Sequence, residues 1–178
     1  MLCLSNGNAE GLGREREKEL ELSCKRLGFT EAPTVIDDND LQDGMDIKWA
    51  PELVADYVTK WCKSKESIDG SEGKIDMIIT FDEGGVSGHT NHNAVYEGVK
   101  ILMEKKMIDV EVMALTTVPL IRKYLGAIDV NFVWMDEWQA FRFDWITAYR
   151  TLALHETQMV WFRKIFIVIS RYTYINSF

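Results

Sequence analysis

Residues 75–92 read IDMIITFDEGGVSGHTNH. The apolar run from Ile75 to Phe81 predicts a strand buried on both faces, which is the pattern of strands in parallel sheets. The glycine-rich stretch from Asp82 to His92 predicts a loop that leads into a helix. Because ligands of open α/β proteins bind beyond the carboxyl ends of the strands, we expect this loop to lie at a functional edge of the sheet.

Strands and helices are predicted to alternate along the rest of the chain. Apolar residues recur at helical spacing in several segments, and short β-branched runs lie between them. The predicted helices cover residues 14–27, 50–63, 91–105 and 145–154, and the predicted strands cover residues 34–36, 75–81, 110–116 and 130–134. This alternation predicts an α/β fold with a mostly parallel sheet. Two further loops, Ser5–Gly13 and Asp37–Asp46, are also rich in Gly, Asn and Asp and are placed at strand ends.

The composition suits one domain and argues against one class of partner. A chain of 178 residues can bury a core of its own, and we predict a single domain over residues 1–178. The net charge of −8 argues against a nucleic-acid binder, since affinity for phosphates needs clustered Lys and Arg. Cys3, Cys24 and Cys62 lack the spacing of metal ligands and are interpreted as reduced thiols. No apolar stretch reaches the roughly 18–20 residues of a transmembrane helix.

The N-terminal residues suggest a chain that begins inside a domain. Met1 to Ser5 has neither the basic start nor the long apolar stretch of a signal peptide. We interpret this segment as the end of a buried strand.

Two of the three histidines, His89 and His92, lie three residues apart at the end of the glycine-rich loop. If His92 lies in the first helical turn, both imidazoles can face one cavity. Neutral imidazole is the commonest protein metal ligand, so the pair is a candidate metal or catalytic site. The alternative is a helix start capped by Thr90 or Asn91, with both histidines merely exposed. Spacing alone does not decide between the two, because two ligands do not make a zinc site and no third His or Cys lies nearby.

Several segments together resemble a known family. They are the segments at residues 2–8 and 16–20, residues 80–82 with the string GVSGHTNH at 85–92, Arg122-Lys123-Tyr124, and residues 158–177. In this order they closely resemble the eukaryotic N-acetylglucosaminyl-phosphatidylinositol (GlcNAc-PI) de-N-acetylases, within the LmbE-like deacetylase superfamily. The resemblance runs from residue 1 to 178 and is weakest between Asp129 and Ala148. It implies a Rossmann-like three-layer sandwich with a mostly parallel sheet and the zinc-dependent removal of an acetyl group in early GPI-anchor biosynthesis.

The resemblance implies catalytic roles at three positions. His92 matches the family's zinc ligand, and His89 matches a histidine that stabilises the oxyanion of the tetrahedral intermediate. A cationic donor in a dry site suits that second role, because it favours the developing negative charge. Asp82 either supports His89 or caps the loop. His155 also matches the family, but we interpret it as structural.

The same resemblance implies substrate contacts from Arg16, Asp43 and Asn8. For Arg16 the alternative is a solvated charge on a helix. For Asp43 the alternative is local turn chemistry, which we favour.

One departure from the family bears on activity. The family's other metal ligands and its general base lie in a His-Pro-Asp-Asp-Glu string after the first strand, and this sequence has no such string. We therefore expect the first strand to be missing and the zinc ligand set to be incomplete. Catalytic zinc normally has three protein ligands, so a catalytically inactive, truncated chain is one alternative. A deacetylase of another sugar conjugate within the LmbE-like group is a second.

The resemblance also implies where the protein works. The expected partners are the glycolipid GlcNAc-PI and the endoplasmic reticulum membrane surface on its cytoplasmic face, with the anchor segment not in this chain. The aromatic, basic stretch Trp161–Arg171 fits a membrane-surface substrate, although core packing is the alternative for Trp161 and Phe162. The aromatic-rich region from Phe132 to Tyr149 departs most from the family, and the sequence does not assign it a role.

Overall fold

The computed structural model describes residues 1–44, 47–66, 74–133 and 138–178. Within them the chain forms two compact units. The first, the histidine unit, consists of residues 37–117 together with Leu2. The second, the helical unit, consists of Met1 and residues 3–36 and 118–178. A single domain over residues 1–178 stays a prediction.

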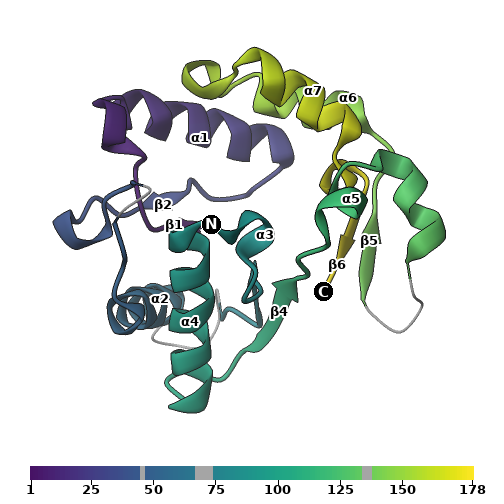
Figure 1. The fold of residues 1–178 in the computed structure, drawn as a ribbon. Helices are drawn as coiled ribbons and strands as arrows, with labels where there is room; N and C mark the ends of the chain where they lie inside the picture. Colours follow the sequence, from purple (N-terminus) through teal and green to yellow (C-terminus); the bar gives the residue numbers. More distant parts are fainter. Residues whose placement is uncertain (45–46, 67–73, 134–137) are drawn as a thin grey trace. The chain divides into compact units, whose positions relative to one another are not determined.

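The histidine unit contains a parallel strand pair, β3 and β4, of which Figure 1 labels β4. Its elements are η2 (Asn39–Leu41), α2 (Pro51–Lys65), β3 (Met77–Phe81), α3 (Gly85–Gly88), α4 (Thr90–Glu104) and β4 (Glu111–Leu115). Met77 lies opposite Glu111 and Phe81 lies opposite Leu115, so both strands end at the same edge. The crossover through α4 is the helical connection that a parallel pair needs.

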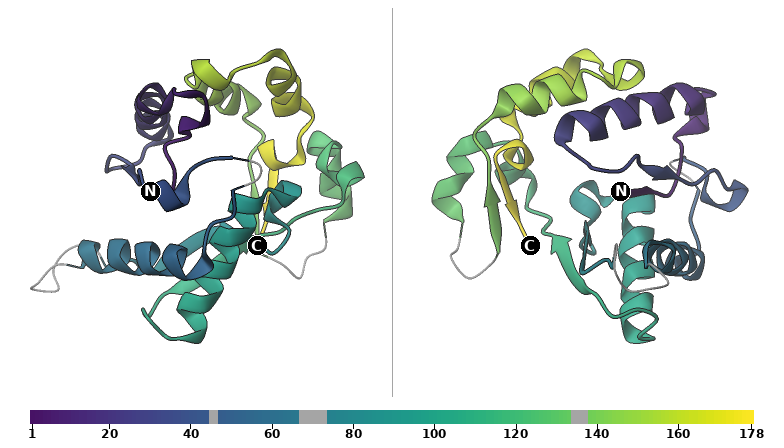
Figure 2. Two further views of the ribbon diagram at one scale, coloured as in Figure 1. Left: turned by 60° about the vertical axis from the view of Figure 1, so that its left-hand side comes forward. Right: turned by 180° about the vertical axis from the view of Figure 1, so that it is seen from behind.

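Helices α2 and α4 supply the core of the histidine unit, and α4 crosses α2 in the ribbon views (Figures 1 and 2). Buried residues recur every fourth position along both helices, at Val54, Val58 and Cys62 and at Ala94, Gly98 and Leu102. Gly98 allows the close approach, because a Cβ there would lie 2.5 Å from Cγ1 of Val54. Pro51 occupies the first turn of α2, where its missing N–H costs nothing.

Strand β3 is less buried than the sequence predicts. Met77 is 42% exposed and Ile79 is 64% exposed, whereas Ile78 and Thr80 are half-buried. Successive side chains of a strand point to opposite faces, and α4 packs against β3, so one face is covered and the other is open. The prediction of a strand buried on both faces is therefore wrong for the described structure.

In the described part of the helical unit, three α-helices longer than two turns lie with two short strand pairs. Its elements are β1 (Leu2–Cys3, Leu2 being grouped with the histidine unit), η1 (Asn8–Glu10), α1 (Gly13–Leu27), β2 (Thr34–Val35), α5 (Leu120–Lys123), η3 (Gly126–Phe132), β5 (Gln139–Phe141), α6 (Trp145–Leu152), η4 (Glu156–Gln158), α7 (Trp161–Ile169), η5 (Arg171–Thr173) and β6 (Ile175–Ser177). The N–H of Thr34 donates to the carbonyl of Met1, at 2.9 Å. Strands β5 and β6 pair in an antiparallel manner.

Buried polar contacts hold α1 against the segment around η4. Glu19, 8% exposed, accepts hydrogen bonds from the N–H and the hydroxyl of Thr157, both at 2.7 Å. The Oγ of Ser23 lies 2.8 Å from Nε2 of His155, and burial lowers the pKa of this histidine. These contacts agree with the interpretation of His155 as a structural residue.

A 3-10 helix, η3, replaces the strand predicted over residues 130–134, of which Trp134 lies outside the described residues. The reason is Asp129, which is fully buried and accepts hydrogen bonds from Arg122 at 2.8 and 2.9 Å and from Arg171 Nε at 2.5 Å. The chain coils around this carboxylate, so a tertiary contact overrides the strand preference of Val130 and its neighbours.

The coarse fold class is confirmed as α/β, with helices between strands and a parallel pair. Among the described residues the strands form three separate two-stranded sheets. The finer expectation, one mostly parallel sheet in a three-layer sandwich, stays a prediction. The described residues form no apolar helix of the length that a membrane span requires.

Candidate functional site

The carboxylate of Asp82 joins the ends of β3 and β4. Asp82 directly follows β3, and Thr117 lies just beyond the end of β4. Its Oδ1 accepts hydrogen bonds from Gly84 N (3.0 Å), Gly85 N (3.1 Å) and Thr117 Oγ1 (2.5 Å), and its Oδ2 accepts one from Thr117 N (2.5 Å). The predicted loop therefore begins at the carboxyl edge of the strand. In these contacts Asp82 anchors the loop; a catalytic role for it stays a prediction.

The backbone after Asp82 turns through conformations with positive φ. Gly85 has φ 56°, and a Cβ there would lie 2.4 Å from Oδ1 of Asn93, so the position has no room for a side chain. Val86 has φ 64°, which costs a β-branched residue about 1–3 kcal/mol. Its N–H donates to Oγ1 of Thr117 at 2.8 Å. Thr117 thus stabilises a turn that the local sequence disfavours.

His92 is fixed on both sides by this loop and strand. Its Nδ1 lies 2.9 Å from the carbonyl oxygen of Gly85, and its ring stacks on Phe81 with centroids 4.1 Å apart and planes 9° apart. A carbonyl can accept but not donate, so Nδ1 carries the proton. In the neutral ring Nε2 then presents a lone pair, which is the form that binds a metal or accepts a proton.

His89 has the opposite arrangement. It is the N-cap of α4, where its Nδ1 accepts a hydrogen bond from the N–H of Asn91 at 3.3 Å. The structure thus corrects the alternative that Thr90 or Asn91 caps this helix. Because Nδ1 accepts, the proton of the neutral ring lies on Nε2, which becomes a donor. In this form the ring is a neutral donor, and the cationic donor that the resemblance implies stays a prediction.

The two imidazoles come together as the sequence predicts. Their centroids are 5.3 Å apart and their planes are tilted by 36°. One ring therefore presents a donor and its neighbour presents an acceptor within one small region. This pairing can bind a polar group that carries both a lone pair and a proton, such as a water molecule beside a carbonyl oxygen.

Asp43 is placed against the same helix start. Asn91, 5% exposed, donates from its amide nitrogen to Oδ1 of Asp43 at 3.1 Å. The side chain of Asp43 therefore ties the preceding loop to α4. Of the predicted loop Asp37–Asp46, Met45 and Asp46 lie outside the described residues.

Arg16 and Asn8 lie in the helical unit and shape the loop before α1. Arg16 donates from Nη1 to the carbonyl of Gly7 and from Nη2 to Glu10, and its side chain is 13% exposed. A solvated helix charge is therefore the wrong alternative for it. Oδ1 of Asn8 accepts a hydrogen bond from Gly13 N at 2.9 Å. The convergence of this loop with His89 and His92 stays a prediction, because the two residues and the two histidines belong to different units.

The sequence analysis missed two residues of the site, Thr117 and Phe81. Thr117 follows β4 just as Asp82 follows β3, so the same strand-end argument could have found it. Phe81 was assigned to the strand, and nothing in its sequence context indicates that its ring would stack on His92. Both act by fixing the geometry of the loop and its histidines.

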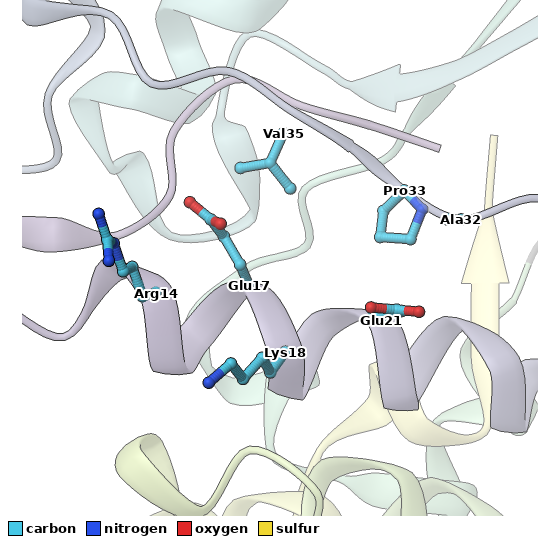
Figure 3. A pocket seen from close by; sticks show the side chains of 7 residues that line it. All are labelled: Arg14, Glu17, Lys18, Glu21, Ala32, Pro33 and Val35. Atoms are coloured by element: carbon cyan, nitrogen blue, oxygen red, sulfur yellow. The ribbon is translucent and has the colours of Figure 1, made fainter.

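A separate pocket of about 470 Å³ lies in the helical unit, between α1 and β2 with the residues before it (Figure 3). Its lining residues are Arg14, Glu17, Lys18, Glu21, Ala32, Pro33 and Val35. None of these is a predicted site residue, and the charges on α1 are of both signs. The pocket therefore offers no chemistry that matches the histidine pair.

The role of Thr117 in holding the loop can be measured. Thr117→Val removes the hydroxyl that accepts a hydrogen bond from the Val86 N–H and donates one to Asp82. We expect the free energy of unfolding to fall by about 1–3 kcal/mol, measured by urea denaturation. Ser87→Ala, an exposed change in the same loop, is the control and should stay within about 0.5 kcal/mol. Equal stability of the two variants would contradict this role.

Comparisons with known proteins show the family of the chain. The family model GlcNAc-PI de-N-acetylase (PIG-L) matches residues 1–103, which include the whole loop from Asp82 to His92. A probable GlcNAc-PI de-N-acetylase of Dictyostelium discoideum is 32% identical over 98% of this chain and 79% of its own length. The GlcNAc-PI de-N-acetylase of Bos taurus is 34% identical over 99% of this chain and 70% of its own. A probable GlcNAc-PI de-N-acetylase of Schizosaccharomyces pombe is 36% identical over 97% of this chain and 70% of its own length.

No solved structure matches this chain. The family model covers more than half of the chain, and these relatives are aligned over nearly all of it. On these grounds, the chain belongs to the GlcNAc-PI de-N-acetylase family.

Proposed function

We propose that this protein hydrolyses the N-acetyl group of GlcNAc-PI, releasing acetate and the free amine in an early step of GPI-anchor biosynthesis. The observation that carries the proposal is the histidine pair, with rings 5.3 Å apart and opposite hydrogen-bonding roles. Amide hydrolysis needs a donor for the carbonyl oxygen and an acceptor near the attacking water. Membership of the family supplies the substrate class.

His89 is proposed to stabilise the charge that develops on the acetyl oxygen. During hydrolysis the water oxygen bonds to the carbonyl carbon, the C–N bond then breaks, and the amine leaves with a proton. The Nε2–H of His89 is free of the capping contact and can donate to the carbonyl oxygen as it becomes negative. Because Nδ1 is engaged by α4, the ring needs little reorganisation when the charge develops.

We propose zinc as the cofactor, with His92 as a ligand through Nε2. The contact of Nδ1 with Gly85 supports this, since metal-binding histidines usually donate their other N–H to such an oxygen. A zinc ion supplies Lewis-acid chemistry and activation of water when it is bound. Among the residues that the structure describes, no three His, Cys, Asp or Glu side chains gather to hold a metal. His92 therefore suits the role of one ligand, and the described residues do not supply a full ligand set.

Substrate contacts are proposed for Arg16, Asn8 and Asp43, which all shape loops. Each side chain already has a partner in the structure: Glu10 for Arg16, Gly13 for Asn8 and Asn91 for Asp43. A polar sugar or inositol hydroxyl would have to share or replace these partners. The cytoplasmic face of the endoplasmic reticulum membrane is the proposed location, because the substrate is a glycolipid. For the fold, we propose the three-layer arrangement of the LmbE-like deacetylases.

The function is tested by acetate release. The purified protein, supplied with Zn²⁺, is incubated with GlcNAc-PI, and acetate and free amine are measured together; we expect equal amounts of each. A soluble N-acetylglucosamine conjugate is the comparison substrate. Faster release from that conjugate would favour a deacetylase of another sugar, and no release from either by the folded protein would favour a catalytically inactive chain.

Zinc binding is tested without turnover. We expect His92→Ala to weaken the affinity for Zn²⁺ by at least about tenfold in calorimetric titration, because a ligand is lost. His155→Gln is the matched control, since this histidine contacts Ser23 in the helical unit and should leave the affinity unchanged. Equal affinities of the His92 variant and the unmodified protein would place the metal elsewhere.

A further inference from the structure

Helix α7 carries an apolar face that points away from its unit. Trp161, Ile165 and Val168 follow one another at i, i+4 and i+7 and therefore share one face. They are 73%, 50% and 48% exposed, whereas Ile167, on the opposite side, is 4% exposed. The helix is thus apolar on its packed side and also on its outer side. A helix whose outer face is apolar needs a second environment to cover it.

The charge around α7 differs from that of the whole chain. The net charge of the chain is −8, yet residues 157–178 contain Arg163, Lys164 and Arg171 and no Asp or Glu. Lys164 is exposed beside the apolar face. Neither Arg163 nor Lys164 forms an ion pair within the part of the chain that the structure describes. Because Arg171 is buried against Asp129, the positive charge that this segment offers to a partner comes from the exposed Lys164 and the half-buried Arg163.

The neighbouring helix α5 also exposes apolar side chains. Tyr124 meets Phe166 edge-on at 6.0 Å between centroids, and the Nζ of Lys123 lies 5.9 Å from the centre of the same ring. On α5, Leu120 is 70% exposed and Ile121 is 79% exposed. In Figures 1 and 2, α7 also runs beside α6, with which it is in contact.

Three properties together favour an anionic bilayer as the occupant of this face. The 9 residues of α7 span about 14 Å, too short for the roughly 30 Å of a bilayer core, so the helix can lie in the surface but not cross it. Trp on the apolar face and Lys at its edge are typical of interfacial helices. A symmetric second copy would instead bring the cations of both copies together, which costs free energy.

We propose that α7 is an in-plane membrane helix, with Trp161, Ile165 and Val168 inserted among lipid tails and Lys164 beside anionic headgroups. The inference rests on the proposed function, because it names the surface on which the glycolipid substrate is met. The outer face of α7 would then be the surface by which this acidic protein binds the bilayer. Lys164 can keep its stem on the apolar side while its ammonium group reaches the headgroups.

The test measures binding to vesicles that contain no substrate, so it can fail independently of the enzymatic activity. Sedimentation is compared for phosphatidylcholine vesicles with and without phosphatidylinositol. The triple variant Trp161→Ser, Ile165→Ser, Val168→Ser should bind the anionic vesicles at least about tenfold less, since three apolar side chains are lost. The triple variant Leu22→Ser, Leu27→Ser, Phe29→Ser is the control, because it removes similarly exposed side chains from α1 and from the residue after its C-cap. We expect its vesicle binding to be unchanged.

The contribution of charge is tested separately. Lys164→Gln should reduce binding to vesicles with phosphatidylinositol and leave binding to pure phosphatidylcholine unchanged, and added salt should act in the same direction. Thermal melting of all variants checks that they fold. Equal vesicle binding of the α7 variant and the unmodified protein would overturn the proposal. So would a dimer of the unmodified protein, seen by ultracentrifugation without lipid, that the α7 substitutions convert to a monomer.

Discussion

Replacing His89 with alanine is expected to lower kcat for de-N-acetylation of GlcNAc-PI by about 10²–10³-fold, because one donor to the developing oxyanion is lost. The value of KM should change little, since the donor acts mainly in the transition state. The measurement is initial-rate acetate release over a range of substrate concentrations. The prediction rests on the hydrogen bond from Asn91 N to Nδ1, which leaves the proton of the neutral ring on Nε2.

The double role of His89 calls for a matched control. Alanine at this position removes the cap of α4 as well as the donor, and loss of a cap costs about 0.5–2 kcal/mol of stability. His89→Asn keeps a residue that caps helices well but cannot place a donor where Nε2 lies. We expect the Asn variant to melt like the unmodified protein and to be as slow as the Ala variant. An Asn variant with normal kcat would show that His89 is only a helix cap.

Removal of the buried carboxylate of Asp129 should have the largest effect on stability. Asp129 is 0% exposed and is the hydrogen-bond acceptor for both Arg122 and Arg171, the latter 1% exposed. Among the described residues, Nη1 of Arg171 has no hydrogen-bond partner, although Nη2 donates to Ser177 at 2.9 Å. Without Asp129 the guanidinium of Arg171 would remain buried without a counter-charge. We expect Asp129→Ala to lower the free energy of unfolding by about 3–5 kcal/mol.

The control for this measurement is Asp144→Ala. Asp144 is an exposed N-cap of α6 whose Oδ1 accepts a hydrogen bond from Thr147 N at 3.0 Å. Its loss should cost about 0.5–2 kcal/mol in the same urea titration. Asp129→Asn preserves the shape of the side chain, so it remains measurable if the Ala variant does not fold, and it should still cost more than Asp144→Ala. Equal effects of the Asp129 and Asp144 variants would contradict a buried charge cluster that stabilises the unit.

Repeating patterns made the helices and the position of the site predictable. The helical spacing of Val54, Tyr57, Val58 and Trp61 predicts a helix over residues 50–63, and the structure confirms α2 with nearly these bounds. The place of Asp82 after an apolar run was enough to predict the loop at the strand end. Both inferences use local order along the chain, which sequence shows directly.

Features that depend on distant residues were not predictable. The exposure of Ile79 depends on how many layers cover β3, and the coil of η3 depends on Asp129 meeting Arg171, which is 42 positions away. The tautomers of the two histidines depend on a carbonyl and an N–H whose positions only the folded loop fixes. The aromatic-rich region at 132–149 also escaped prediction, and its residues 134–137 lie outside the described residues.

The hydrogen bonds of Asp82 have a consequence for how the chain selects its strand pairing during folding. A slip of β4 by one residue against β3 would turn its side chains to the wrong faces and would move Thr117 away from the carboxylate. Gly84 and Gly85 would keep their own contacts, but the two bonds to Thr117 would be lost together. Misaligned pairings therefore lack part of the stabilisation of the native pairing. Asp82 and Thr117, which hold the loop that positions His92, thus also favour the native register of β3 and β4.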